Sequence, residues 1–301
     1  MTLEEQLATP TRKRPKGTKP DVAAGISYNV ELQRLVRAVT RDINANLMPT
    51  VRNLAPEYQR DSASDVTDSA LVMDSWVDVL TNALRALRAL RIRWSSPQFQ
   101  ALANDVARRF VTSANNSNRR RTERDMGIDI FSDSTTITNY VQASIADNVR
   151  LIQSIPEQYL TQVESIVMTN IRSGGRPSSI AKSLQQQFGV TERRAKMISR
   201  DQTSKVNGDL NRMRQQDVGF EYFKWSTSHD ERVRDRHEDI SEKRTAYGVG
   251  VYRWDNPPLS DRGTPIICGQ DFQCRCIAIP VSNEEVDENK RKGLTNPSVK
   301  R

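Results

Sequence analysis

The chain has 301 residues, a formal net charge of +8 and only three cysteines. This length suffices for one large domain or two ordinary ones, with a sizeable core. No stretch approaches eighteen apolar residues and the N-terminus has no apolar signal core, so the sequence predicts neither a membrane span nor a secretory signal. We therefore expect the protein to fold in a reducing cytoplasm, where its cysteines form no disulfide framework.

The basic residues are concentrated in the first twenty residues, in an arginine-rich helix and in the last dozen residues. Clustered basic side chains bind nucleic acid by neutralising phosphates, whereas a solvated surface with basic tails is the alternative. The N-terminal run is the candidate contact with nucleic acid or with a partner, and it consists of Arg12, Lys13, Arg14, Lys16 and Lys19.

Residues 1–25 contain prolines and this basic run, so we expect a flexible basic N-terminal segment. Residues 26–218 have helical periodicity almost throughout. One apolar stripe runs from Leu32 to Leu47, and a longer one starts at Val72. Residues 26–218 are therefore predicted to be a helical region.

Two breaks are expected within the helical region. Residues 113–125 are rich in Asn, Ser and Arg, which indicates a flexible junction or a contact loop for an acidic partner. A short helix starting at Pro177 is expected to end at Gly189, and Thr191 is expected to cap the next helix. Such a pair of helices can bind DNA, but it is more often a plain packing unit.

The pattern changes after Gly219. Aromatic and β-branched runs predict short strands at residues 220–225, 251–254 and 277–281. Residues 219–281 are therefore predicted to form a small α+β module, followed by a charged flexible tail over residues 282–301. The expected fold class is α+β, with a mostly α-helical N-terminal region and a small β-containing C-terminal module.

Both histidines and all three cysteines lie between His229 and Cys276. Thiolates and imidazoles are the ligands that zinc prefers, and a tetrahedral site needs four ligands. The candidate set is His237, Cys268, Cys274 and Cys276. Its spacing is unusual, because Cys274 and Cys276 are separated by one residue, whereas structural zinc knuckles usually have two to four residues between their cysteines. Small buried cysteines and surface histidines are the alternative, so no cofactor is expected unless zinc binds.

His229, Asp230 and Glu231 match the H-x-E half of the zinc deaminase signature. The other half requires P-C-x-x-C, whereas here Pro265 is followed by two isoleucines before Cys268. Deaminase chemistry is therefore not predicted, and neither a P-loop nor a nucleophile elbow is present.

The motifs from Ser199 to His237, together with a closing Cys-Arg-Cys, resemble the core of the phage Mu F-like family, also described as the SPP1-type head morphogenesis family. The match extends over about 80 residues in order and spacing. The residues that carry it are Arg200, Asp201, Asn207, Trp225, Ser228, Asp230, Arg232, Arg234, His237, Cys274, Arg275 and Cys276.

This resemblance implies a minor head protein that is made in the bacterial host cytoplasm and packaged inside the virion head near the portal. The implied partners are the portal protein, scaffold, major capsid protein and packaged DNA. The implied roles are head morphogenesis and DNA packaging or ejection, and the protein is not expected to be an enzyme. Some relatives carry an enzymatic tail after the module, and none is expected here because the chain ends at residue 301.

Two other functions remain open on the residues alone. One is a zinc-dependent enzyme that acts on nucleic acid, either deaminase-like or a nuclease, and the other is a free DNA-binding protein.

The charged residues of the motif also permit a structural interpretation. Asp230, Arg232 and Arg234 are expected to form a charge-assisted network with Arg200 and Asp201 of the preceding helix. Such a network would hold the helix to the C-terminal module, so Asp230→Ala is expected to loosen that module.

Overall fold

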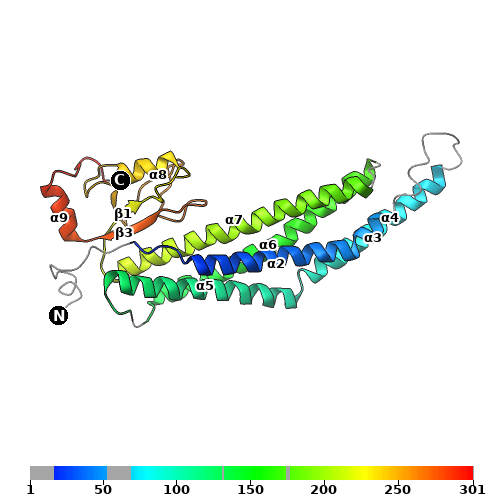
Figure 1. The fold of residues 1–301 in the computed structure, drawn as a ribbon, viewed down its shortest axis with the longest axis horizontal. Helices are drawn as coiled ribbons and strands as arrows, with labels where there is room; N and C mark the ends of the chain where they lie inside the picture. The colour runs from blue at the N-terminus through cyan, green and yellow to red at the C-terminus, as the bar shows by residue number, and fades with distance from the viewer. Residues whose placement is uncertain (1–16, 53–68, 131, 174–176, 301) are drawn as a thin grey trace. The chain divides into compact units, whose positions relative to one another are not determined.

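The structure is a computed structural model that describes residues 17–52, 69–130, 132–173 and 177–300. Within these ranges the chain is mostly helical, with eight helices and one three-stranded antiparallel sheet near the C-terminus (Figure 1). The expected fold class is therefore confirmed. No helix in these ranges has the length and apolar character needed to cross a membrane.

The long helices come first in the chain and the strands follow. The helices are α2 (Val22–Asn46), α3 (Met48–Arg52), α4 (Ser69–Arg93), α5 (Pro97–Met126), α6 (Thr135–Arg172), α7 (Pro177–Asp217), α8 (Asp235–Glu242) and α9 (Asn283–Arg291). The strands are β1 (Tyr222–Ser226), β2 (Val251–Arg253) and β3 (Ile277–Val281).

The chain divides into two compact units, and neither is a continuous segment. Unit 1 comprises residues 1–25, 109–144 and 200–301, whereas unit 2 comprises residues 26–108 and 145–199. The boundaries fall inside α2, α5, α6 and α7. This division differs from the sequence-based one, which was drawn where helical periodicity changes to strand periodicity. Periodicity cannot show that one helix belongs partly to each of two units.

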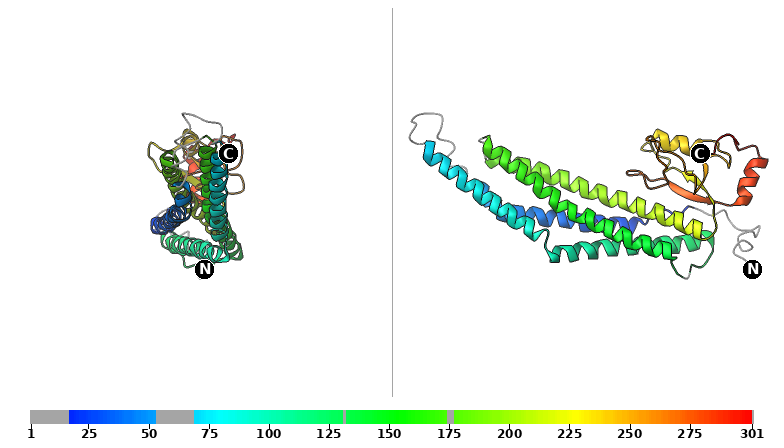
Figure 2. Two further views of the ribbon diagram at one scale, coloured as in Figure 1. Left: turned by 90° about the vertical axis from the view of Figure 1, so that its right-hand side faces the viewer. Right: turned by 180° about the vertical axis from the view of Figure 1, so that it is seen from behind.

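Unit 2 is a bundle whose helices run alongside one another (Figures 1 and 2). The stripe expected between Leu32 and Leu47 is buried, and so are Leu87 and Leu90 of α4. Tyr28 donates a hydrogen bond from its hydroxyl to Asn148 Oδ1 at 2.9 Å. The apolar stripes thus form the core, because each helix buries one face against its neighbours.

The arginines of α4 pair with acidic residues of unit 2. Arg91 contacts Glu164 at 2.5 Å, and Arg93 contacts Asp42 at 3.1 Å. These contacts agree with arginines that pack around a helix.

The break expected at residues 113–125 is wrong, because these residues belong to α5. Asn115 and Asn118 are buried and bind the guanidinium of Arg214 from α7 at 2.8 and 2.6 Å. The polar composition of this stretch therefore reflects a buried hydrogen-bond network rather than a loop.

The break expected at Gly189 is also wrong, since α7 continues through it. Thr191 does not cap a helix start; its hydroxyl donates to the carbonyl of Gln187 at 2.9 Å, one turn earlier in the same helix. Helix α6 likewise continues through a proline, Pro156. The helix-turn-helix pattern is therefore absent from this part of the described chain.

The sheet has the strand order β2-β1-β3, and both pairings are antiparallel. Strand β3 has the expected bounds, whereas β1 begins two residues later than residues 220–225 predict, at Tyr222. Phe220 packs instead against Met126 and Ile128. Gly219 adopts a φ of 91° after α7, a conformation that suits glycine at a helix C-terminus.

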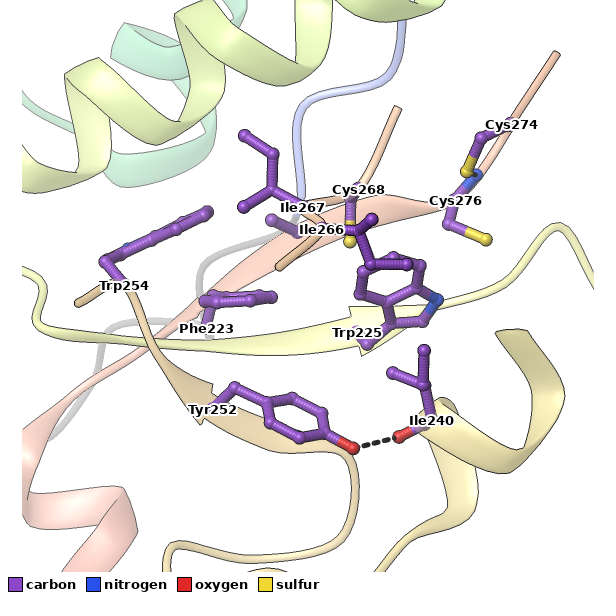
Figure 3. Close-up of a cluster of buried hydrophobic side chains, with 11 residues drawn as sticks. Phe223, Trp225, Ile240, Tyr252, Trp254, Ile266, Ile267, Cys268, Cys274 and Cys276 are labelled. Carbon is purple, nitrogen blue, oxygen red and sulfur yellow. Dashed lines mark hydrogen bonds between the residues drawn. The ribbon is translucent and has the colours of Figure 1, made fainter. Parts of the chain in front are cut away.

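An aromatic cluster covers the sheet (Figure 3). Phe223 of β1 stacks on Trp254 with ring centroids 4.0 Å apart, and Trp225 is fully buried. Tyr252 of β2 donates from its hydroxyl to the carbonyl of Ile240 in α8 at 2.8 Å. These large side chains supply apolar area to a sheet of short strands.

The flexible tail expected over residues 282–301 is wrong for most of its length. Ser282 and Glu285 form a reciprocal capping box at the start of α9. After this helix, the backbone amide of Asn296 donates to the carbonyl of Thr245 at 2.7 Å. The segment is therefore attached to unit 1.

Candidate functional site

The site begins where α7 contacts the turn at Cys268 and Gly269. A Cβ atom on Gly208 would lie 2.2 Å from the carbonyl oxygen of Cys268, and one on Gly269 would lie 2.6 Å from that of Ser204. Both positions therefore require glycine, because the two backbones are in direct contact. Sequence reasoning missed both glycines, because nothing in the local pattern indicates this close approach.

A hydrogen bond between Gln273 and α7 positions the segment that contains Cys274 and Cys276. The backbone amide of Gln273 donates to Asp201 Oδ1 of α7 at 2.9 Å. The same carboxylate contacts Lys205 at 2.7 Å. Helix α7 thus fixes the residue that directly precedes Cys274.

His237, Cys274 and Cys276 lie together at the edge of the aromatic cluster. His237 Nδ1 is 3.7 Å from Cys274 Sγ and 3.6 Å from Cys276 Sγ, and all three side chains are buried. Both cysteines precede β3, which begins at Ile277, and their sulfurs face the same ring nitrogen.

Cys268 lies outside this cluster. The ligand atoms of His237, Cys274 and Cys276 lie within 4.8 Å of one another, and Cys268 is not part of that group. Cys268 packs among the apolar side chains, whereas Cys274 and Cys276 lie at the end of the cluster beside Trp225 (Figure 3). Burial raises the pKa of the Cys268 thiol well above its ordinary value. The four-residue ligand set is therefore brought together only in part.

Asp271 orients the histidine ring. His237 Nε2 lies 3.1 Å from Asp271 Oδ2, and Trp225 packs edge-on against the ring at 5.3 Å between centroids. Burial lowers the pKa of His237, but the hydrogen bond and charge of Cys274 and the charge of Asp271 raise it more, so the net shift is upward. Sequence reasoning missed Asp271, which had no pattern to distinguish it from other surface acids.

The two cysteines of the cluster differ in their acidity. A hydrogen bond from Cys276 and another from His237 lower the pKa of Cys274 to about 4, against the effect of burial. The pKa of Cys276 is raised, chiefly by the hydrogen bond with Cys274 and by burial. The contact between the two sulfurs thus favours one thiolate rather than two in the metal-free pair.

A pocket of about 190 Å³ opens onto the cluster. Four arginines contribute to its wall, together with serines, Val233, Gln273 and the three cluster residues. The arginines are Arg200, Arg232, Arg234 and Arg275. Ser228 of the family motif and Ser204 also line the pocket. This lining is strongly positive and suits an anionic ligand.

The expected network between Asp230 and Arg200 is wrong in its partners. Asp230 is paired with Arg275 by two hydrogen bonds, of 2.5 and 2.6 Å. Hydrogen bonds from Arg275 lower the pKa of Asp230 to about 2. Arg234 contacts Asp271 at 3.0 Å, and Arg232 donates its backbone amide to Asp230.

The Asp230–Arg275 pair does not support the expectation that Asp230→Ala loosens the module. Both side chains are about a third exposed, at 34% and 39%. Ion pairs in such surroundings are screened by solvent and contribute little to stability.

The contacts that hold the segments together are buried and lie elsewhere. Asn207 and Asn211 of α7 donate to the carbonyl oxygen of Thr18 at 3.0 and 2.7 Å. Asn118 donates to both asparagines, and Arg214 pairs with Asp133 at 2.7 Å. Asn207 of the family motif therefore has an architectural position, while the role of Arg214 was missed.

The remaining candidates are placed as follows. Arg12, Lys13, Arg14 and Lys16 lie outside the described residues, and Lys19 is exposed. His229 and Glu231 are not part of the His–Cys cluster. His229 instead lies 3.3 Å from the hydroxyl of Thr227. The H-x-E pattern is thus not assembled into a metal-ligand group within the described residues.

Comparison with known proteins connects these features to a family. Residues 161–279 match the family described as Phage Mu protein F like protein. The chain is 28% identical over 296 residues to an uncharacterized protein of Haemophilus influenzae, across 95% of this chain and 60% of that relative. The chain thus spans about 60% of the relative's length. No solved structure is similar to the chain at a significant level. Residues 161–279 of the chain therefore form a Phage Mu protein F-like domain.

Proposed function

We propose that the protein is a minor head protein of a bacteriophage, that it associates with the portal inside the head, and that it acts in head morphogenesis rather than as an enzyme. The observation that carries this proposal is the family match over residues 161–279, which includes the end of α6, all of α7 and most of the C-terminal sheet. DNA packaging and ejection are the further roles that such a position would allow.

The polar residues of the family motif support an architectural role. Asn207 binds the N-terminal segment through Thr18, Asp201 binds the backbone of Gln273, and Arg234 binds Asp271. Each contact joins segments that are distant in the sequence. Such contacts stabilise a single folded conformation, as expected for a protein that is built into a larger particle.

Helix α2 supports association with another protein. Val22, Ile26 and Val30 are exposed, at 69%, 60% and 38%, and they are spaced four residues apart. Residues at this spacing lie along one side of a helix. An exposed apolar stripe of this kind favours helix docking onto a partner surface. We assign this stripe to the contact with the portal.

The arginine-lined pocket favours one alternative, an enzyme that acts on nucleic acid. Four arginines beside a His–Cys cluster suit a phosphate-bearing ligand. Under this alternative, the purified protein cleaves or deaminates nucleic acid, and chelation of metal abolishes the activity.

Quantitative mass spectrometry of purified virions tests the proposed function, together with a pull-down of the portal protein by the tagged chain. We expect a few copies per particle and co-purification with the portal. Absence from both virions and portal complexes would overturn the proposal.

Two variants of α2 make the test specific. Val22→Asp combined with Ile26→Asp places charges in the apolar stripe and is expected to abolish portal co-purification. Ala45→Asp introduces the same residue at an exposed position of the same helix and is the matched control. Circular dichroism should show equal helix content for both variants. Equal portal binding by both would show that the stripe is not the contact.

A further inference from the structure

We propose that His237, Cys274 and Cys276 bind one zinc ion, through Nδ1 of the histidine and Sγ of each cysteine. This site is independent of the proposed function, since neither the family match nor a position near the portal requires a metal. It is also distinct from the four-residue set that the sequence suggests, because Cys268 takes no part in it.

The separations within the cluster are those of a tetrahedral site. Zinc binds imidazole nitrogen at about 2.0–2.1 Å and thiolate sulfur at about 2.3 Å, which places the nitrogen and sulfur of a tetrahedral site about 3.6 Å apart. The observed distances from His237 Nδ1 to the two sulfurs are 3.7 and 3.6 Å. The ligand atoms are thus spaced for one ion at their centre.

The histidine is held in the orientation that a metal ligand needs. Asp271 accepts a hydrogen from Nε2, which leaves the lone pair of Nδ1 directed at the sulfurs. Metal-binding histidines commonly donate their other ring N–H to a carboxylate in this way. The structure therefore provides both the ligands and the group that orients one of them.

The charge and the chemistry of the cluster also favour zinc. Two thiolates neutralise the charge of Zn²⁺, so the bound site can remain buried beside the apolar cluster. The cysteines are free thiols in this structure and not a disulfide. Nδ1 and the two sulfurs face one another on side chains that are each less than 7% exposed, so the three protein ligands themselves are buried.

The fourth position faces the arginine-lined pocket. Among the described residues, no other His, Cys, Asp or Glu belongs to the ligand group. The pocket is lined by all three ligand residues, so solvent can reach the ion from that side. Three protein ligands with one exchangeable position distinguish this site from closed structural sites.

Zinc content is measured first, on the full chain purified under reducing conditions. We expect one zinc per chain by elemental analysis, and none in Cys274→Ser or His237→Ala. Cys268→Ser is the matched control, because it changes a buried cysteine outside the ligand group, and it should retain full zinc content. Asp271→Asn should keep the ligands but weaken zinc binding about ten- to a hundredfold.

A second measurement uses only the unchanged protein, in case the ligand variants fail to fold. After replacement of zinc by Co²⁺, the visible bands of a tetrahedral cobalt site and a thiolate-to-cobalt charge-transfer band should appear. X-ray absorption of the zinc form should show two sulfur atoms at about 2.3 Å and two lighter atoms at about 2.0–2.1 Å.

Three results would overturn the site. They are no metal in the protein even after refolding with excess zinc, a disulfide between Cys274 and Cys276 under reducing purification, or equal loss of zinc in Cys268→Ser and Cys274→Ser. None of them would affect the virion result, so the zinc site and the proposed function fail or succeed separately.

Discussion

At the scale of single residues, Gly208 is the more restricted of the two glycines in α7. A Cβ atom at this position would lie 2.2 Å from a backbone oxygen, whereas a Cβ on Gly189 of the same helix would meet only the end of the Arg193 side chain at 3.6 Å. A backbone oxygen cannot move away as a flexible side chain can. Gly208 thus has no room for a side chain, whereas Gly189 of the same helix has room for one.

Gly208→Ala is expected to destabilise the protein by about 1–3 kcal/mol or more, because the methyl group forces α7 away from the Cys268–Gly269 turn. Gly189→Ala is the matched control and is expected to be stabilising by up to about 1 kcal/mol, since alanine is the better helix former. Chemical denaturation followed by circular dichroism measures both. Equal effects of the two changes would contradict the close approach.

At the scale of secondary-structure elements, α9 depends on its first residue. Ser282 accepts a hydrogen bond from the backbone amide of Glu285 at 3.2 Å, and Glu285 accepts one from the amide of Ser282 at 3.4 Å. The helix is short, so its cap is a large part of what stabilises it. Val286 of α9 is buried against Val251 and Val281 of the sheet.

Ser282→Ala removes the cap and is expected to cost about 1 kcal/mol. Amide hydrogen exchange of residues 283–291 should accelerate, while that of unit 2 should not change. Ser282→Thr keeps a hydroxyl acceptor and should exchange at the rate of the unchanged protein. If Ser282→Ala leaves the exchange of α9 unchanged, the capping box does not stabilise the helix.

The elements that sequence patterns predict well are those with apolar periodicity. The stripe from Leu32 to Leu47 and strand β3 follow directly from such patterns. The polar stretch at residues 113–125 does not, because its buried asparagines face Arg214 across a sequence separation of 96 and 99 residues. A polar residue with a distant buried partner has the same local pattern as a loop residue.

The site was predictable to a similar extent. The concentration of histidine and cysteine after His229 identifies the region, and His237, Cys274 and Cys276 do come together. Spacing could not separate Cys268 from the other two cysteines, because the choice depends on the turn at Gly269. The Ser282-x-x-Glu285 pattern was visible in the sequence and would have predicted α9.

At the scale of the whole molecule, the C-terminal sheet depends on residues outside the segment 219–281. Gln215 of α7 donates to the carbonyl of Ala278 in β3 at 3.1 Å, Phe220 packs on Met126, and Val286 covers Val281. All of these partners belong to unit 1. A boundary drawn where helical periodicity ends therefore cuts through one core.

A fragment of residues 219–281 is expected to lack a cooperative fold. It should give a poorly dispersed amide spectrum in nuclear magnetic resonance and should be cleaved rapidly by protease, whereas the full chain should be resistant under the same conditions. The reason is the loss of the buried contacts from α5, α7 and α9. A dispersed spectrum with a sharp unfolding transition would show that the segment is an independent domain.

The two hydrogen bonds at the carbonyl of Thr18 have a consequence for biosynthesis. Thr18 is separated from Asn207 and Asn211 by 189 and 193 residues. At a ribosomal rate of about 5–20 residues per second, roughly 10–40 s pass between the synthesis of the acceptor and that of its donors. Every residue of unit 2 precedes Arg200 and has been made by then. The nascent N-terminal segment therefore lacks these two hydrogen-bond donors until α7 has been made, so its attachment to α7 follows the synthesis of all of unit 2.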